Sequence, residues 1–337
     1  MKHQRVIVVT GASAGLGRAI VHEFARPGVK IGLIARDEDG LRAAAREVQD
    51  LGGTALVLPL DVADADAVEA AATQVEETLG PIDVWVNNAM VSVFSPVKEM
   101  NAAEFKRVTD VTYLGYVHGT LSALKRMLSR NEGVIVQVGS ALAYRAIPLQ
   151  SAYCAAKHAI KGFTESLRCE LLHDRSKVKV TMVHMPALNT PQFSWVKSRL
   201  PNKPQPVPPI YQPEVGARAV VWAAEHAPRE LKVGYPTLEA VLGEKLFPGY
   251  LDRYLSKTGY AAQQTDEPVA TDRLDNLYQA VAGDHGAHGD FDSRATYKSE
   301  QLWLATHKPL LAVAMGSVLS LAYYLKTKAQ RKNRRAS

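Results

Sequence analysis

The chain reads Thr10-Gly11-Ala12-Ser13-Ala14-Gly15-Leu16-Gly17 directly after the apolar run Val6–Val9, and a helical stretch follows. A glycine turn between a strand and a helix lets backbone N–H groups approach a pyrophosphate at the positive end of that helix. The spacing is G-x-x-x-G-x-G rather than G-x-G-x-x-G, and turns recruit glycine for many reasons. Because it follows the first strand of an alternating pattern, we interpret the stretch as a phosphate-binding loop, with these candidate contacts: Gly11, Ser13, Ala14, Gly15, Leu16 and Gly17.

Apolar runs and helical stretches alternate along the first 240 residues. The runs cover residues 5–10, 30–35, 54–60, 82–86, 133–138, 178–184 and 231–235. Helices are predicted between them, for example over 63–79, 102–128, 151–172 and 214–225. Continuously apolar strands that alternate with helices indicate a parallel sheet covered on both faces. We therefore predict a Rossmann-type, doubly wound α/β domain with about seven parallel strands and ligands at the carboxyl ends of these strands.

The alternation stops in the C-terminal third of the chain. Six prolines between residues 201 and 213 predict an extended loop rather than a helix or a central strand. Residues 256–300 are polar and suit a surface wrap or a linker. Residues 310–325 carry no charge and precede a cationic tail. We predict four parts, namely a catalytic domain (1–250), a polar extension (251–308), an apolar helix that anchors the chain in a membrane (309–326) and a basic tail (327–337).

The composition is that of a globular protein. Of 337 residues, 47% are hydrophobic and 22% are charged, which excludes collagen-like, disulfide-stapled and wholly disordered classes. The net charge is +6, and residues 326–337 hold six cations and no acid, so six minus six leaves residues 1–325 neutral. This distribution predicts no nucleic-acid partner. Two cysteines, Cys154 and Cys169, are too few for a disulfide framework and favour a reducing compartment.

Arg36 ends the second predicted strand. An acid at this place accepts hydrogen bonds from an adenosine ribose hydroxyl, whereas an arginine suits a 2′-phosphate. With Ser13 and Arg18 as further candidates, Arg36 therefore indicates NADP(H) rather than NAD(H) as the cofactor. An exposed arginine at the start of a helix is the alternative interpretation.

Tyr153 and Lys157 lie four residues apart on one face of a predicted helix, and Ser140 ends the fifth predicted strand. A Tyr-x-x-x-Lys pair alone carries little information, but with Ser140 and the glycine loop the sequence resembles the classical short-chain dehydrogenase/reductase family. The matching segments follow the family's order and spacing over about residues 4–240. They are Thr10–Gly17, Asp61-Val62, Asn87-Asn88-Ala89, Ser140 with Tyr153 and Lys157, and Pro186-Ala187 with Thr190.

The resemblance implies hydride transfer between a nicotinamide and a carbonyl or alcohol. Tyr153 is then the general acid/base, Ser140 orients the substrate oxygen, and Lys157 holds the nicotinamide ribose. The cofactor contacts that it implies are Asp61 and Val62 at the adenine, Asn87, Asn88 and Ala89 at the ribose, and Thr190, with Pro186 of the same motif, at the carboxamide. A free tyrosine titrates near ~10, and we expect the neighbouring ammonium and the positive charge of an oxidised nicotinamide to lower the pKa of Tyr153.

The chain departs from the family pattern at two positions. The family's fourth catalytic residue is an asparagine three residues before a glycine, and here Thr112 precedes Gly115. Thr112 remains a candidate for the proton relay through its backbone carbonyl. Met90 replaces the glycine of the familiar Asn-Asn-Ala-Gly and puts a flexible apolar side chain beside the expected nicotinamide.

Apolar residues are the candidates for a substrate wall: Met90, Val91, Leu142, Tyr144, Met185, Leu188, Phe193 and Trp195. They favour a lipophilic alcohol, aldehyde or ketone, although apolar residues beside such a sheet are also ordinary core. Phe193–Pro213 lies where the family carries its substrate lid. His285 and His288, with Asp290 and Asp292, look like metal ligands but lack helical spacing, so we interpret them as a solvated loop without a metal.

We predict an NADP(H)-dependent oxidoreductase that interconverts a lipophilic secondary alcohol and a ketone or aldehyde. The alternative, motivated by Thr112, is a membrane-attached NADP-binding protein with little or no turnover. We expect a cytoplasmic catalytic domain, membrane association through residues 310–325, and a homo-oligomer. A buried helix that closes the core or a dimer interface is the alternative for residues 310–325.

Overall fold

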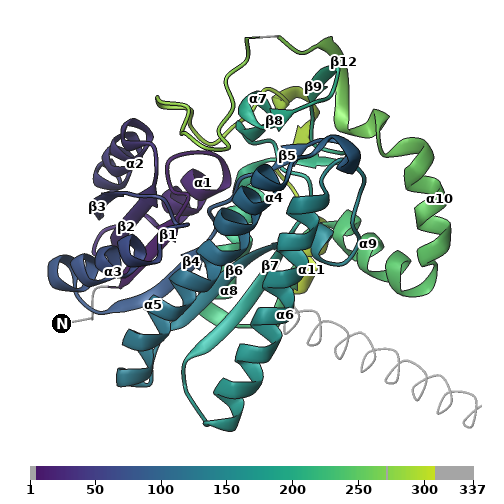
Figure 1. Ribbon diagram of the computed structural model, residues 1–337. Coiled ribbons are helices and arrows are strands. Elements are labelled where there is room, and N and C mark those ends of the chain that lie inside the picture. Colours follow the sequence, from purple (N-terminus) through teal and green to yellow (C-terminus); the bar gives the residue numbers. More distant parts are fainter. Residues whose placement is uncertain (1–4, 271, 308–337) are drawn as a thin grey trace, which may run out of the picture. The chain divides into compact units, whose positions relative to one another are not determined.

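A seven-stranded parallel sheet is the centre of the fold, with the strand order β11-β7-β6-β4-β1-β2-β3 (Figure 1). The computed structural model describes residues 5–270 and 272–307. The strand order reverses at β1, which pairs with β2 on one side and β4 on the other, and the predicted doubly wound sheet is confirmed. The strands are β1 (Val6–Thr10), β2 (Lys30–Ala35), β3 (Thr54–Pro59), β4 (Ile82–Asn87), β6 (Val134–Ser140), β7 (Lys179–Met185) and β11 (Glu230–Lys232).

Helices pack on both faces of this sheet (Figure 1). One layer contains α1, which contacts α2 and α8, and the other contains α3, which contacts α5, together with α4 and α6. The bounds are α1 (Gly15–Phe24), α2 (Glu38–Asp50), α3 (Ala65–Leu79), α4 (Ala102–Thr109), α5 (Gly115–Arg130), α6 (Ser151–His173) and α8 (Pro213–His226).

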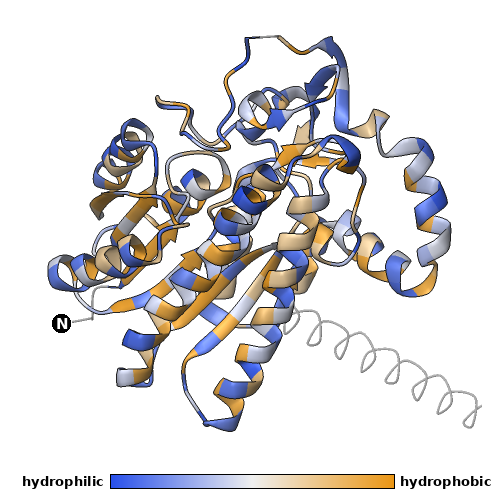
Figure 2. Cartoon of the chain, in the orientation of Figure 1, coloured by the Kyte–Doolittle hydropathy of each residue, from blue (hydrophilic) through white to orange (hydrophobic). Residues whose placement is uncertain are grey.

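The strand sequences explain why the sheet lies in the core. All five residues of β1 are buried, and five of the six residues of β2 are buried. Burial of each Val, Leu or Ile side chain contributes about 1.5–3 kcal/mol relative to exposure. Figure 2 shows the same pattern, with apolar strands beneath helices whose outward faces are polar.

The helix predicted over residues 102–128 is interrupted. A π-helical turn, Asp110–Leu114, lies between the end of α4 and the start of α5. A Cβ atom on Gly115 would lie 2.6 Å from Val62 Cγ2, so a glycine is needed where α5 approaches the chain that follows β3. Such π-turns occur mostly as single insertions in helices, often at functional sites.

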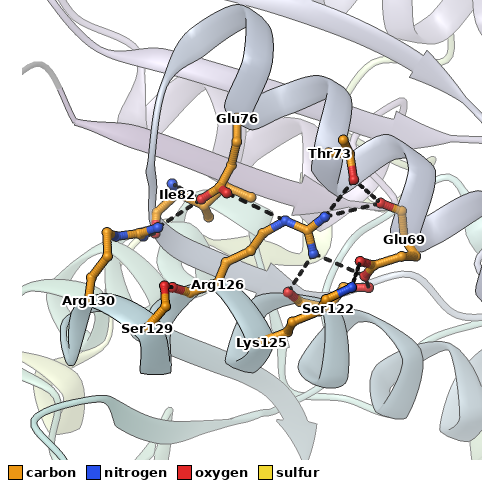
Figure 3. Close-up of polar contacts among 9 residues, drawn as sticks. All are labelled: Glu69, Thr73, Glu76, Ile82, Ser122, Lys125, Arg126, Ser129 and Arg130. Carbon is orange, nitrogen blue, oxygen red and sulfur yellow. Dashed lines mark hydrogen bonds and ion pairs between the residues drawn. The ribbon is translucent and has the colours of Figure 1, made fainter.

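Arg126 fastens α5 to α3 (Figure 3). Its guanidinium donates to Glu69 Oε2 at 3.0 Å and to Thr73 Oγ1 at 2.7 Å, and it lies 3.6 Å from Glu76 Oε2. Arg130, one turn later, donates to Glu76 Oε1 at 2.9 Å. Because the Arg126 side chain is only 9% exposed, these contacts are shielded from water and fix the relative position of the two helices.

The compact unit that contains the sheet extends to Lys298. After β11 the chain forms α9 (Tyr235–Leu246) and α10 (Pro248–Thr258). In the proline-rich stretch, β9 (Asn202–Pro204) pairs with β12 (Gln264–Pro268), and β10 (Ile210–Tyr211) pairs with β13 (Ala295–Thr296). These short strands lie outside the central sheet, as the prolines require. The shorter elements are β5 (Val93–Phe94), β8 (Lys197–Ser198) and α7 (Gln192–Trp195).

The described residues of the second unit, from Ser299, hold one helix, α11 (Glu300–Thr306), whose N-cap is Ser299. Within residues 5–270 and 272–307, no helix is both long enough and apolar enough to span a bilayer. The predicted apolar helix over 309–326 and the basic tail over 327–337 lie outside the described residues.

Candidate active site

A cavity of about 410 Å³ lies at the carboxyl ends of the central strands and brings together most of the predicted site residues. Its lining includes the following predicted residues: Gly11, Ser13, Ala14, Gly15, Leu16, Gly17, Arg36, Asp61, Val62, Asn88, Ala89, Ser140, Tyr153, Lys157, Pro186 and Thr190. Ligands of doubly wound sheets bind at this edge, beside the point where the strand order reverses. The cavity is therefore the candidate active site.

The glycine loop between β1 and α1 depends on its glycines. Gly11 and Gly15 have φ values of 69° and 59°, a left-handed conformation that favours glycine. A Cβ atom on Gly17 would lie 1.8 Å from the Gly11 carbonyl oxygen. The loop therefore brings the first turn of α1 close to the end of β1.

Arg36 extends from the end of β2 into the cavity wall. Its Nη2 donates to the Asn276 carbonyl oxygen at 2.6 Å, whereas its buried Nη1 has no hydrogen-bond partner among the described residues. Burial lowers the pKa of Arg36, and the Asp61 carboxylate raises it in part. Arg18, the other predicted helper, does not line the cavity, because its side chain is buried against Glu47 and the Ser13 carbonyl.

Ser140 ends β6, and Tyr153 and Lys157 lie one turn apart on α6. Burial raises the pKa of Tyr153, although a hydrogen bond with Ser140 lowers it in part. The expected decrease in the pKa of Tyr153 is therefore wrong for the protein alone. The reason is that Tyr153 is itself buried, and burial disfavours its charged form more than the hydrogen bond with Ser140 favours it. Burial also lowers the pKa of Lys157, to about 7.

Lys157 is held by two buried acceptors. Its Nζ donates to the Val138 carbonyl at 2.8 Å and to the Tyr116 hydroxyl at 3.0 Å. The Tyr116 hydroxyl in turn donates to the same Val138 carbonyl at 3.0 Å. Tyr116 was not predicted from the sequence, since it lies next to Gly115 and outside the family's catalytic motif.

Two predicted residues lie beside the cavity rather than in its lining. The Asn87 side chain is fully buried and bonds to Trp85 and Thr120. Thr112 is also fully buried, and its hydroxyl donates to the Val91 carbonyl at 2.8 Å and accepts from the Val91 N–H at 3.0 Å. Both side chains therefore bond to neighbouring buried residues and do not face the cavity.

The substrate part of the cavity is largely apolar. Seven of the eight predicted wall residues line it, namely Met90, Val91, Leu142, Met185, Leu188, Phe193 and Trp195. Tyr144 does not, because its hydroxyl donates to Glu230 Oε2 at 2.6 Å. Polar lining residues that the sequence did not single out include Ser92, Gln150, Gln192 and Gln205.

The strap, residues 272–292, supplies a further wall that was not predicted. Asn276, Ala280, Val281 and His285 line the cavity, and the Gly15 N–H donates to the Gly286 carbonyl at 2.9 Å. In Figure 1 this yellow-green segment passes above α1. Its contacts with the glycine loop and with Arg36 use backbone carbonyls, which any residue type supplies, so the sequence carries no signal for them.

The two histidines of the strap, predicted to lie in a solvated loop, make specific side-chain contacts. His285 packs edge-on against Trp195, with ring centroids 4.5 Å apart. His288 contacts Glu214 at 2.6 Å and Asp292 at 3.0 Å. Within the described part of the chain, no group of three or more His, Cys, Asp or Glu side chains is arranged to hold a metal ion.

Comparison with known proteins identifies related chains. Residues 5–199 match the family model for short chain dehydrogenases. The oxidoreductase YxnA of Bacillus subtilis is 34% identical over 316 residues, which cover 92% of this chain and 87% of that protein. A fatty acyl-CoA reductase of Acinetobacter baylyi is 29% identical over 229 residues, or 67% of this chain and 75% of that protein. The crystal structure of a metagenomic short-chain oxidoreductase in complex with NADP is 29% identical, has a TM-score of 0.58 and covers 68% of this chain and 96% of its own.

Proposed function

The chain belongs to the short-chain dehydrogenase family of oxidoreductases, and from this premise we propose that it transfers hydride between NADP(H) and a lipophilic alcohol or carbonyl compound. The observation that carries the proposal is the arrangement of the cavity. The glycine loop, Arg36 and the Ser140–Tyr153–Lys157 trio line a single space at the carboxyl ends of the strands.

The residues present fit a phosphorylated dinucleotide. The glycine loop presents the positive end of α1, where a pyrophosphate binds. Arg36 Nη1 is a buried donor with no partner among the described residues, and a 2′-phosphate would satisfy it. Lys157 would hold the nicotinamide ribose and Thr190 the carboxamide, as in the family. The NADP complex of the metagenomic relative supports this choice of coenzyme.

Tyr153 and Ser140 act on the substrate oxygen. In the reduction of a carbonyl, the Tyr153 phenol donates its proton to this oxygen, and the Ser140 hydroxyl donates a hydrogen bond to it. The bound coenzyme supplies the hydride for this direction and accepts it in alcohol oxidation. The Lys157 ammonium, 5.5 Å from the centre of the Tyr153 ring, favours the tyrosinate that remains after proton transfer.

The Tyr116 hydroxyl is a support for Lys157 that does not belong to the family's catalytic motif. Thr112 stands at the asparagine position. Its hydroxyl accepts a hydrogen bond from the Val91 N–H and donates one to the Val91 carbonyl. Lys157 instead bonds directly to Tyr116 and to Val138. We infer that Tyr116 positions Lys157 and keeps part of its charge in a buried site.

The apolar wall supports a lipophilic substrate. Around Tyr153 the cavity is lined by side chains such as Met90, Phe193 and Trp195, and Gln150 and Gln205 are neutral. Most small-molecule sites combine such walls with a few polar groups that set orientation. The relative that is named a fatty acyl-CoA reductase supports the same substrate class.

We also propose that the chain attaches to a membrane through residues 310–325, with the catalytic domain in the cytoplasm. Sixteen uncharged residues carry this part of the proposal. The second hypothesis for function is a membrane-attached NADP-binding protein with little or no turnover. It is motivated by Thr112, which stands where the family has its fourth catalytic residue, an asparagine.

Oxidation of NADPH with a panel of lipophilic aldehydes and ketones tests the proposal. We expect turnover with NADPH well above that with NADH, and none in Tyr153→Phe, which should still bind NADPH. Tyr297→Phe, a change at an exposed tyrosine outside the cavity, is the matched control and should keep full activity. A wild type that binds NADPH but reduces none of the panel, with Thr112→Asn gaining turnover, would favour the second hypothesis.

A further inference from the structure

The strap enters the candidate coenzyme site through Asn276. This residue lies far beyond the part of the chain that matches the family model, which ends at residue 199. It nevertheless lines the cavity together with Arg36, Asp61 and Val62. The proposed function places Arg36 at the 2′-phosphate, and the resemblance to the family places Asp61 and Val62 at the adenine.

The backbone on both sides of Asn276 is fixed. Its N–H donates to the Trp195 carbonyl at 3.0 Å, and its own carbonyl accepts from Arg36 Nη2 at 2.6 Å. The next residue, Leu277, is fully buried in the core beside Val62, and its carbonyl accepts from Arg107 Nε at 2.9 Å. The backbone that carries the Asn276 side chain is therefore held in place before any ligand binds.

The Asn276 side chain has an unused acceptor. Its Oδ1 atom is buried and has no hydrogen-bond partner among the described residues. A buried polar atom without a partner is unfavourable, and such an atom on a residue that lines a cavity points to a ligand that satisfies it. Arg36, whose Nη2 bonds to the carbonyl of the same asparagine, has in Nη1 a buried donor that also lacks a partner among the described residues.

We infer that Asn276 is a coenzyme-binding residue and that the strap completes the adenosine half of the site. This inference rests on the proposed function, since it takes NADP(H) as the ligand. The two unused groups complement an adenosine 2′-phosphate: the phosphate accepts from Arg36, and the adenosine offers amino and hydroxyl donors to Asn276 Oδ1. The strap thus adds a contact that the family motifs do not contain.

Binding of coenzyme fragments tests this inference. Calorimetric titrations use NADPH, NADH, adenosine 2′,5′-bisphosphate and nicotinamide mononucleotide. We expect Asn276→Ala to weaken NADPH and the adenosine bisphosphate about tenfold, which corresponds to about 1.4 kcal/mol, and to leave the mononucleotide unchanged. Gln279→Ala is the matched control, because Gln279 is an exposed amide of the same strap that does not line the cavity.

A second variant distinguishes a direct contact between Asn276 and the coenzyme from an indirect effect in which the substitution only detaches the strap. Asn276→Asp has the same size but places a carboxylate beside Arg36 and the 2′-phosphate. We expect it to weaken NADPH more than NADH, which a structural role would not do. Equal affinities of wild type and Asn276→Ala for NADPH, or equal losses in Gln279→Ala, would overturn this inference alone. Failure of the wild type to bind either dinucleotide would overturn the proposed coenzyme as well.

Discussion

Lys157 depends on a hydroxyl that the family pattern does not contain, and this dependence can be measured. Burial lowers the pKa of Lys157 to about 7, and the Tyr116 oxygen accepts a hydrogen bond from its ammonium. Removal of this acceptor in Tyr116→Phe disfavours the charged form, so the pKa of Lys157 should fall further. We expect kcat to drop about three- to tenfold near neutral pH and the limb of the pH–rate profile that reports Lys157 to move to lower pH.

Tyr113→Phe is the control for this experiment, because Tyr113 packs against the same apolar cluster as Tyr116. Its pH–rate profile should match that of the wild type. A Tyr116→Phe profile that is lower in kcat but not displaced along the pH axis would show that Tyr116 supports the fold and not the ammonium.

Arg36 sets the choice between the two nicotinamide coenzymes. One nitrogen of its guanidinium is bound to the Asn276 carbonyl, and the other is buried and unpaired among the described residues. A hydrogen bond to a charged group contributes about 1.5–3 kcal/mol, so Arg36→Ala should weaken NADPH about ten- to hundredfold and NADH much less. Fluorescence titration of both coenzymes measures this, with Arg42→Ala, a change at an exposed arginine on α2, as the control. Equal losses for the two coenzymes would contradict the assignment.

Single site residues differed in how far the sequence predicted them. Ser140, Tyr153 and Lys157 could be placed because strand ends and a helical spacing of four put them at one edge of the sheet. Thr112 and Asn87 were placed in the same region, but their side chains are buried and bond to Val91 and Thr120 instead of lining the cavity. Which way a buried side chain points depends on its neighbours in three dimensions, and sequence spacing does not contain this information.

At the scale of elements, the parallel strands were predictable because central strands such as β1 and β2 are almost continuously apolar and buried. The strap was not, since its contacts with Gly15 and Arg36 use the carbonyls of Gly286 and Asn276. The composition of a polar, glycine-rich stretch predicts a linker even where its backbone makes specific hydrogen bonds, because these bonds leave no mark on the residue types. The π-turn at Asp110–Leu114 was missed for a similar reason, because it changes no periodicity long enough to detect.

The contact between α3 and α5 makes stability depend on acid pH. Burial raises the pKa of Glu69, but hydrogen bonds from Arg126, Lys125 and Ser122 outweigh this and lower it to about 2. A carboxylate with a depressed pKa stabilises the fold above its unfolded pKa, near ~4.3, and this contribution is lost as pH falls toward the folded value. We expect wild type to be more stable than Glu69→Gln at pH 7 and the difference to shrink below about pH 4.

Urea unfolding of both proteins between pH 3 and pH 7 measures this difference. Glu77→Gln, which changes an exposed residue of the same helix, should show no such pH-dependent gap. A constant gap for Glu69→Gln over the whole range would show that the charge of Glu69 contributes nothing. Arg126→Met should cost about 1.5–3 kcal/mol at pH 7.

The strap and the lid, Phe193–Pro213, are joined, so we expect them to open together. Arg273 of the strap donates to the carbonyls of Phe193 and Ser194, and Trp195 packs against His285. Arg273→Ala removes the two hydrogen bonds from the guanidinium to the carbonyls of Phe193 and Ser194. Amide hydrogen exchange should then become about tenfold faster in both segments, while Arg253→Ala on α10 should change neither. Faster exchange in the strap alone would show that the two segments move independently.

At the scale of the whole molecule, the charge distribution separates two regions of the chain. Residues 1–325 are neutral overall, and the six surplus cations lie between residues 326 and 337. Each cation near an anionic membrane surface contributes about 1 kcal/mol. Any electrostatic attraction to lipid therefore comes from the end of the chain that follows the apolar segment, and the catalytic unit adds no net charge to it.

We predict that residues 310–325 attach the chain to a membrane. These residues carry no charge, and a helix of this length would extend about 24 Å, slightly less than the ~30 Å hydrocarbon core of a bilayer. Lys308 and Lys326 flank the segment and can reach the interface. A lipophilic substrate also concentrates in the bilayer, where an attached enzyme would meet it. We expect the intact chain in the membrane fraction of cells and a chain truncated at Lys308 in the soluble fraction, with equal NADPH affinity. The control deletes only residues 327–337 and should remain in the membrane fraction at physiological salt. Equal solubility of all three proteins would show that the segment is a buried part of the fold or of an interface between copies.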